Sequence, residues 1–268
     1  MVNSEVPVAS AKQPPAFNAP FVVLFLIGVM IAGFVVFDWA DPAQQEQMLL
    51  YFSLVPARFI APVGLPEMFF PGGVAGDVWT LITYTFMHAN WTHVILNSFW
   101  LLAFGSPIAR RIGSARFVLF YFFCGIVGAL LHVALNGGSM VPVIGASGAI
   151  SGLMGGAARF VFLAGGPLGG LAGQAGPSSA PRAQAGIVQA LSDRRVLIFV
   201  AVWIGGNFLF GVTGITPDGS TANIAWVAHL GGFLAGLFFF GFFDPYRSSS
   251  SGGPGNVGYG EWSGRDGN

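Results

Sequence analysis

The sequence predicts an all-α membrane protein, a bundle of six transmembrane helices with a long first external loop. Of its 268 residues, 54% are apolar and only 8% are charged, whereas a soluble domain carries about a quarter charged residues. The mean hydropathy is +0.69. The apolar residues also form runs, and the length of each run is close to the roughly 20 residues that a helix needs to cross a hydrocarbon core.

Six such runs follow one another along the chain. The first begins after Pro20 and stops at Asp38, and no small-x-small cleavage site follows it cleanly, so we expect a retained anchor rather than a signal peptide. The fifth follows an arginine pair and the sixth ends at Asp244. The predicted spans are 21–37, 81–104, 117–135, 145–164, 196–214 and 224–243.

The segments between and beyond these spans predict a single membrane domain over 21–243. The long external loop covers 38–80, and its stretch 46–59 is too short to span and is expected to lie along the membrane interface. The Gly-, Ala- and Ser-rich segment 165–195 is typical of a flexible linker. Residues 1–20 are predicted to be a cytoplasmic segment, and 244–268 a disordered cytoplasmic tail.

The basic residues predict the orientation of the bundle. With six spans both termini share one side, and every Lys and Arg except Arg58 falls on that side. Cytoplasmic loops retain Lys and Arg, so we expect both termini in the cytoplasm. The preference for Arg over Lys and the lack of an organelle presequence favour a bacterial inner membrane. A formal net charge of zero gives no reason to expect a nucleic-acid partner.

Histidines are the polar residues that stand out in the apolar runs. His88, His93, His132 and His229 all fall within predicted spans, and the predicted topology places each in the external half of the bilayer. Ionisable groups inside a membrane cost free energy, so a histidine retained there is by default a candidate functional residue. Such a cluster could line a water-filled cavity that opens to the exterior.

Two glycine-rich spans carry a candidate nucleophile and its base. Ser147 lies in GASGAISG, and His229 lies in AHLGGFLAG. Small residues at spacings of three and four let two helices approach closely. Each residue taken alone is better explained by packing. Together they predict a serine oxygen within hydrogen-bond reach of an imidazole, which an activated nucleophile requires.

The residues around this pair narrow the chemistry. No Asp or Glu occurs in the second to sixth predicted spans, so we expect a Ser–His dyad whose imidazole is oriented by packing or backbone. The chain has no H-E-x-x-H zinc motif and no intramembrane aspartate pair. His93 and Asn97, four residues apart, could donate to an oxyanion together with the Ser147 N–H. His88 could be structural or line water access, and His132 is expected to be structural.

These motifs together resemble the rhomboid family of intramembrane serine proteases. The resemblance covers about residues 79–243 and rests on H-x4-H-x3-N from His88 to Asn97, GASG around Ser147 and AHxxGxxxG from Ala228 to Gly236. It implies a six-helix bundle that cleaves transmembrane proteins in or near their spans, without metal or cofactor. By the same resemblance Ser147 would be the nucleophile, His229 the general base, and His93 and Asn97 oxyanion donors.

Three positions depart from the family pattern. Thr80 follows Trp79 where the family often has Arg, and Ala109 stands where many members have Glu. The family uses both residues to anchor the external loop. Ser151 stands where some members place a Tyr that packs on the catalytic histidine. None of these changes removes a reacting group.

Two other functions fit the composition. A non-catalytic relative would bind and escort membrane proteins, but such proteins generally lack the Ser or the His. A channel or transporter could use the histidines as a proton relay, but it would need polar residues in the inner half of the bundle. The oligomeric state and the natural substrate are left open by the sequence.

Overall fold

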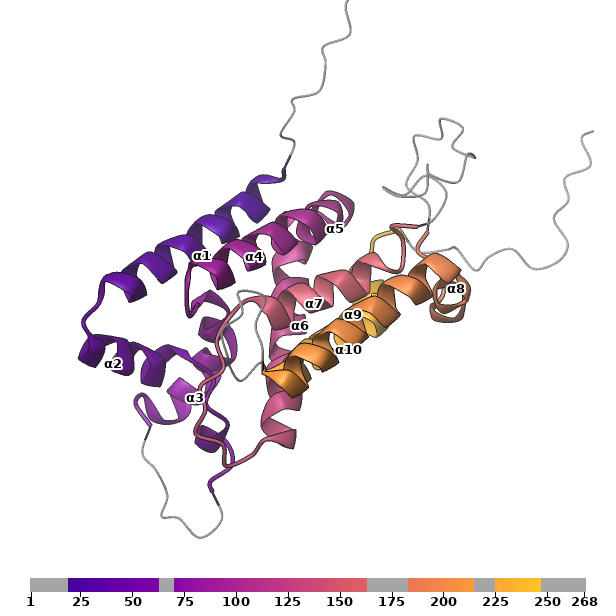
Figure 1. Ribbon diagram of the computed structural model, residues 1–268. Helices are drawn as coiled ribbons and strands as arrows, with labels where there is room; N and C mark the ends of the chain where they lie inside the picture. Colours follow the sequence, from indigo (N-terminus) through magenta and orange to yellow (C-terminus); the bar gives the residue numbers. More distant parts are fainter. Residues whose placement is uncertain (1–18, 63–69, 163–182, 215–224, 247–268) are drawn as a thin grey trace, which may run out of the picture.

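The structure, a computed structural model, describes residues 19–62, 70–162, 183–214 and 225–246. Regular structure in this part is helical (Figure 1), with one isolated bridge between Leu54 and Val143. The helices are α1 (Phe21–Trp39), α2 (Pro42–Phe52), η1 (Pro56–Arg58), α3 (Gly73–Thr83), η2 (Tyr84–Phe86), α4 (Trp91–Trp100), the π-helical turn η3 (Leu101–Gly105), α5 (Ser106–Ile112), α6 (Ser114–Leu135), α7 (Ser147–Ala157), α8 (Ile187–Ser192), α9 (Arg194–Thr213) and α10 (Trp226–Phe243).

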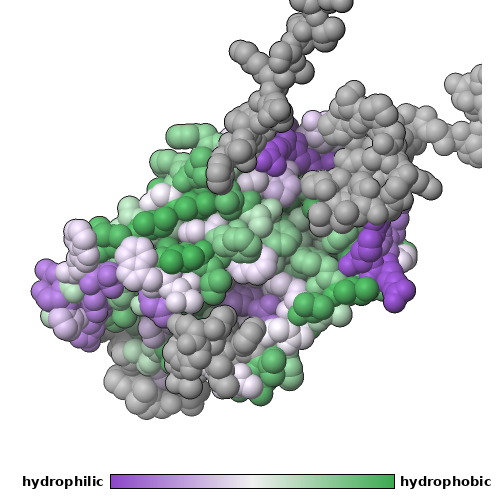
Figure 2. Space-filling view, turned by 45° about the horizontal axis from the view of Figure 1, so that its top comes forward, coloured by the Kyte–Doolittle hydropathy of each residue, from purple (hydrophilic) through white to green (hydrophobic). Residues whose placement is uncertain are grey.

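Five helices in the described residues are long and apolar enough to cross a membrane. They are α1, the continuous helix Trp91–Ile112, α6, α9 and α10. Large apolar side chains remain exposed on them, including Phe21 at 80%, Val202 at 70% and Phe242 at 74%. Figure 2 shows apolar residues over much of one face, with hydrophilic residues mostly toward its ends. Extensive exposed apolar surface indicates a lipid or protein environment rather than water.

The second predicted span is wrong at both ends. The helix begins at Trp91 and continues to Ile112, whereas residues 81–90 contain the last turn of α3, the 3-10 turn η2 and an irregular segment. Asn90 starts the new helix because its side chain accepts a 2.8 Å hydrogen bond from the His93 N–H. His88 therefore lies in irregular backbone, outside any span helix.

The fourth predicted span is only partly helical. α7 covers eleven residues and ends at Ala157, which is too short to cross a bilayer alone. Turns follow as far as Phe162, where the buried Arg159 donates to the backbone oxygens of Ala185 and Leu237, both at 2.8 Å. All of α7 after Ser147 is buried, so it runs through the middle of the bundle rather than along its lipid-facing surface.

Glycine faces bring α7 and α10 into backbone contact. A Cβ added to Gly232 would overlap the carbonyl oxygen of Gly148, and one added to Gly236 would overlap that of Gly152. Gly128 of α6 packs against the α10 backbone in the same way, with 2.5 Å from its added Cβ to a carbonyl oxygen. This contact confirms that the small-residue faces of the two motifs meet, as their spacing predicts.

The segment between α1 and α4 is anchored by Arg58. Its guanidinium donates to the carbonyl oxygens of Leu50 at 2.9 Å and Pro71 at 3.1 Å, and it pairs with Asp77 at 3.3 Å. Thr80 is buried, and its hydroxyl donates to the Asp77 carbonyl at 3.3 Å. Arg58 thus supplies an anchor for this segment even though Thr80 replaces the Arg expected from the family pattern.

Ala109 does not bear on this anchoring, contrary to the expectation from the family pattern. It lies in α5, away from α2 and α3 in Figure 1. Ala109 is twelve positions after Asn97 in the same continuous helix, or about 18 Å at 1.5 Å per residue.

Arg111, two residues after Ala109, ties α5 to the end of α10. It forms a two-pronged salt bridge with the buried Asp244, at 2.8 and 3.1 Å.

Three predicted segments lie largely outside the described residues: the N-terminal segment 1–20, the linker 165–195 and the tail 244–268. Of these segments the structure describes only residues 19–20, 183–195 and 244–246. Within the described part of the predicted external loop, the chain forms α2, η1 and α3. Helix α2 begins before the stretch 46–59, where Asp41 and Gln44 form a capping box, and it ends within that stretch at Phe52.

Candidate active site

Ser147 is the first residue of α7, and the turn before it is set by Gly145. Gly145 has φ +114°, a conformation that side chains rarely adopt. Its N–H donates to the Tyr84 carbonyl at 2.9 Å, which fixes the turn against η2. Because Ser147 begins the helix, its N–H and those of the next residues have no carbonyl within α7 to bind. The loop thus presents a serine beside several backbone donors.

The Ser147 hydroxyl lies in hydrogen-bond contact with the His229 imidazole. Its Oγ is 2.6 Å from Nε2 of His229, across 82 positions of sequence. His229 is the fourth residue of α10, and its N–H lies 3.3 Å from the Ala225 carbonyl in the first turn. The glycine contacts between α7 and α10 make this short distance possible.

Asn207 completes the surroundings of His229 and was missed by the sequence reasoning. Its Oδ1 lies 2.6 Å from Nδ1 of His229, on the opposite side of the ring from Ser147. The sequence predicted that packing or backbone would orient the imidazole. In the structure a side-chain amide contacts the ring as well. The signal in the sequence is a polar residue inside the apolar run of α9, because an amide in a membrane span needs a polar partner.

His93 lies against the turn that precedes Ser147. A Cβ added to Gly145 would come within 2.6 Å of Nε2 of His93, so glycine at this position makes room for the imidazole. The side chain of Asn97 is buried and its Nδ2 donates to the His93 carbonyl at 2.9 Å. An amide NH2 carries two donors, and this bond uses one of them.

The other two histidines are placed differently. The buried His88 packs edge-on against His93, with ring centroids 4.9 Å apart. His132 lies near the end of α6, where Nδ2 of Asn136 is 3.5 Å from its Nδ1 and donates to its carbonyl at 3.0 Å. His88 thus belongs to the surroundings of the site through His93, whereas the hydrogen bonds described for His132 are made with Asn136, at the end of α6.

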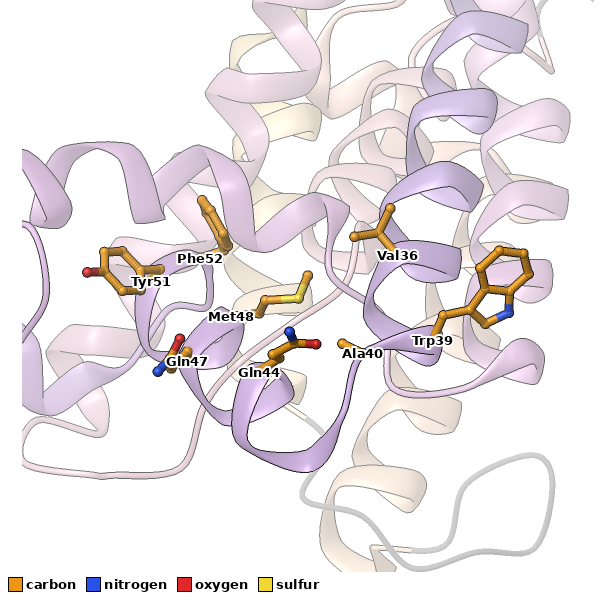
Figure 3. A pocket seen from close by; sticks show the side chains of 8 residues that line it. All are labelled: Val36, Trp39, Ala40, Gln44, Gln47, Met48, Tyr51 and Phe52. Carbon is orange, nitrogen blue, oxygen red and sulfur yellow. The ribbon is translucent and has the colours of Figure 1, made fainter.

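An open apolar groove lies elsewhere in the molecule, between the end of α1 and α2 (Figure 3). Figure 3 shows Met48 and Val36 facing across it from the two helices. No residue of α7, α9 or α10 lines it, so it is separate from the Ser–His pair. Its lining residues are Val36, Trp39, Ala40, Gln44, Gln47, Met48, Tyr51 and Phe52.

The fold and the site together define a class. This is a multi-pass, helical integral membrane protein that holds a serine and a histidine in hydrogen-bond contact within its bundle. The model of the rhomboid domain matches residues 75–244, which is more than half of the chain and includes every candidate site residue. The chain belongs to the rhomboid family.

Several curated proteins are similar to it. The putative rhomboid protease YdcA of Bacillus subtilis is 39% identical over 114 residues, which is 42% of this chain and 56% of the relative. The rhomboid protease GluP of the same organism is 28% identical over 170 residues, or 61% of this chain and 25% of the relative. Rhomboid-like protease 1 of Toxoplasma gondii is 41% identical over 80 residues, covering 30% and 27%. The matched region thus covers at most 56% of the length of any of these three relatives.

Proposed function

We propose that this protein is an intramembrane serine endopeptidase that cleaves membrane proteins in or near their transmembrane segments. The observation that carries the proposal is the 2.6 Å contact between Ser147 Oγ and His229 Nε2. A serine hydroxyl is a weak nucleophile until an adjacent base takes its proton. The names of the relatives, several of which are called rhomboid proteases, support the same activity.

The proposed reaction has two stages. In the first, His229 Nε2 takes the Ser147 proton while Oγ bonds to the carbonyl carbon of the scissile peptide. The tetrahedral intermediate then collapses, and His229 returns the proton to the leaving amine as the C–N bond breaks. In the second, water attacks the Ser147 ester with His229 again as the base, releasing the acid product and restoring the hydroxyl. Neither stage requires a metal or cofactor.

Oxyanion stabilisation is assigned to donors at the start of α7 and on α4. The Ser147 N–H lies at a helix N-terminus, where backbone donors and the helix dipole favour negative charge. The His93 imidazole adjoins Gly145 two residues before the nucleophile, and Asn97 carries a second amide hydrogen. Donors aimed at the developing charge are a large part of acyl-transfer catalysis.

We further propose a six-span topology over 21–243 with both termini cytoplasmic, in which α7 together with the turns that follow it to Phe162 forms the fourth, centrally buried span. Arg110, Arg111, Arg159 and the pair at the start of α9 lie at helix ends remote from Ser147, which supports this orientation under the positive-inside rule. Residues 1–20 and 244–268 would then be cytoplasmic tails, and a bacterial inner membrane would be the location. Transmembrane proteins within the bilayer would be the substrates.

The proposal is tested with purified protein in liposomes that also contain a reporter transmembrane segment. We expect wild type to cleave the reporter and His229→Ala to lower turnover by about 100-fold or more, the usual contribution of a general base. His132→Ala is the matched control, because it removes another intramembrane histidine, one whose described hydrogen bonds are to Asn136 and not to Ser147 or His229, and it should retain most activity. Binding of the reporter without cleavage by wild type would favour a non-catalytic escort function instead.

A separate prediction concerns the oxyanion donors. Asn97→Ala should lower turnover by about 10- to 1000-fold, in line with the loss of one donor, while apparent KM changes little. The control is Ser98→Ala, since Ser98 also bonds back to its own helix, to the Val94 carbonyl at 2.7 Å, yet has no assigned role. Unchanged turnover in Asn97→Ala would remove Asn97 from the oxyanion site.

A further inference from the structure

Asn207 of α9 contacts the imidazole ring atom that faces away from the nucleophile. The Nδ1 of His229 lies 2.6 Å from Oδ1 of Asn207, and the Nε2 lies 2.6 Å from Ser147 Oγ. The three side chains come from three different helices, α7, α9 and α10. A ring held at both nitrogens has a fixed tilt as well as a fixed tautomer.

The other end of the Asn207 amide decides which atom faces the histidine. Its Nδ2 donates to the Trp203 carbonyl at 2.9 Å, and a carbonyl can only accept. The amide oxygen must therefore point at His229, so that Nδ1 of the ring carries the proton and donates it. Nε2 is then left with its lone pair toward the Ser147 hydroxyl, which is the tautomer that a general base requires.

Trp203 also fixes where α9 lies against α10. Its indole stacks on Phe233 with centroids 4.3 Å apart and an interplanar angle of 19°. Phe233 is one helical turn after His229, just as Trp203 is one turn before Asn207. The stack and the hydrogen bond therefore join the same two turns of α9 and α10, and the stack holds Asn207 opposite the imidazole.

Among the residues that the structure describes, Asn207 is the side chain that bonds to Nδ1 of His229. Ser151, one turn after the nucleophile, donates its hydroxyl to the Ser147 carbonyl at 2.7 Å, so it is bonded within α7. The second to sixth predicted spans contain no carboxylate that could orient the ring. We propose, resting on the proposed function, that Asn207 is a positioning residue that holds His229 in its basic tautomer and aims Nε2 at Ser147.

The test compares two variants of similar volume. Asn207→Leu fills the space without an acceptor, and Asn207→Asp keeps an acceptor oxygen in the same place. We expect Asn207→Leu to lower kcat about 10- to 100-fold, as for loss of a hydrogen bond to a group that becomes charged, with little change in KM. Asn207→Asp should stay within about 10-fold of wild type. Asn136→Leu is the control, because Asn136 sits beside His132 in a similar way.

A second measurement separates positioning from helix docking. The rate at which a small fluorophosphonate labels Ser147 reports activation of the hydroxyl without substrate docking. We expect Asn207→Leu to slow labelling by the same factor as kcat, with a melting temperature near that of wild type. Equal kcat and labelling in Asn207→Leu and wild type would overturn the inference, as would equal losses in the Leu and Asp variants. The proposed function itself fails only if wild type does not cleave or His229→Ala is fully active.

Discussion

Ser147→Ala is expected to reduce cleavage of a reporter segment by at least about 1000-fold, because in the proposed mechanism the Ser147 oxygen forms the acyl intermediate. The hydrogen bond that the Ser147 hydroxyl makes is to His229, so its removal should leave the packing of α7 intact. The measurement is single-turnover cleavage in liposomes, alongside the thermal unfolding of the same preparation. A melting temperature close to that of wild type would show that the loss is chemical.

Ser151→Ala is the matched control for this variant. It removes a second hydroxyl from the same helix, one turn further on, where the group is bonded to the Ser147 carbonyl. We expect this variant to keep most of the wild-type rate. Full cleavage by Ser147→Ala, or equal losses in both variants, would contradict the assignment of Ser147 as nucleophile.

Gly236→Ala is expected to damage both stability and activity. The added methyl would overlap the Gly152 carbonyl oxygen and lie 2.6 Å from its carbon, and these backbone atoms cannot move aside as a flexible side chain could. Overpacking of this kind costs about 3 kcal/mol, or about 6–12 °C in melting temperature for a domain of this size. Since α7 carries Ser147 and α10 carries His229, separating them should also lower turnover by about 100-fold or more.

Gly28→Ala gives the comparison for the glycine effect. Gly28 also lies within a transmembrane helix, α1, but a Cβ there would meet nothing within 4 Å. Alanine is favoured over glycine in a helix by about 1 kcal/mol, so this variant should be as stable as wild type or slightly more so. If Gly236→Ala were equally stable and active, close contact between α7 and α10 would not be what holds the site together.

Composition and periodicity were enough to predict the helical membrane bundle. They predicted the ends of the individual helices less accurately. The apolar runs located α1, α6, α9 and α10 to within a few residues, because lipid-facing helices must be apolar along their length. They failed at residues 81–104, where the turn and the cap at Asn90 interrupt a continuous apolar pattern. They also failed at α7, which protein surrounds on all sides and which ends before a full span.

The contact between Ser147 and His229 could be predicted from the glycine spacing. Two helix faces lined with glycine can pack closely, and Ser147 and His229 lie on those faces. Asn207 could not be placed in this way. Its role depends on the rotation of α9 about its axis, which the Trp203–Phe233 stack sets and which hydropathy does not encode. The anchoring by Arg58 was likewise invisible, because its carbonyl partners are backbone atoms of distant residues.

The most direct test of the central claim is to find which atom an active-site reagent modifies. Wild-type protein in liposomes is treated with a fluorophosphonate, and the labelled peptide is located by tandem mass spectrometry. We expect one adduct per chain, on Ser147, with labelling at least about 100-fold slower in His229→Ala. Cleavage of the reporter by protein that carries no adduct on Ser147, or labelling of Ser147 that does not depend on His229, would contradict the account.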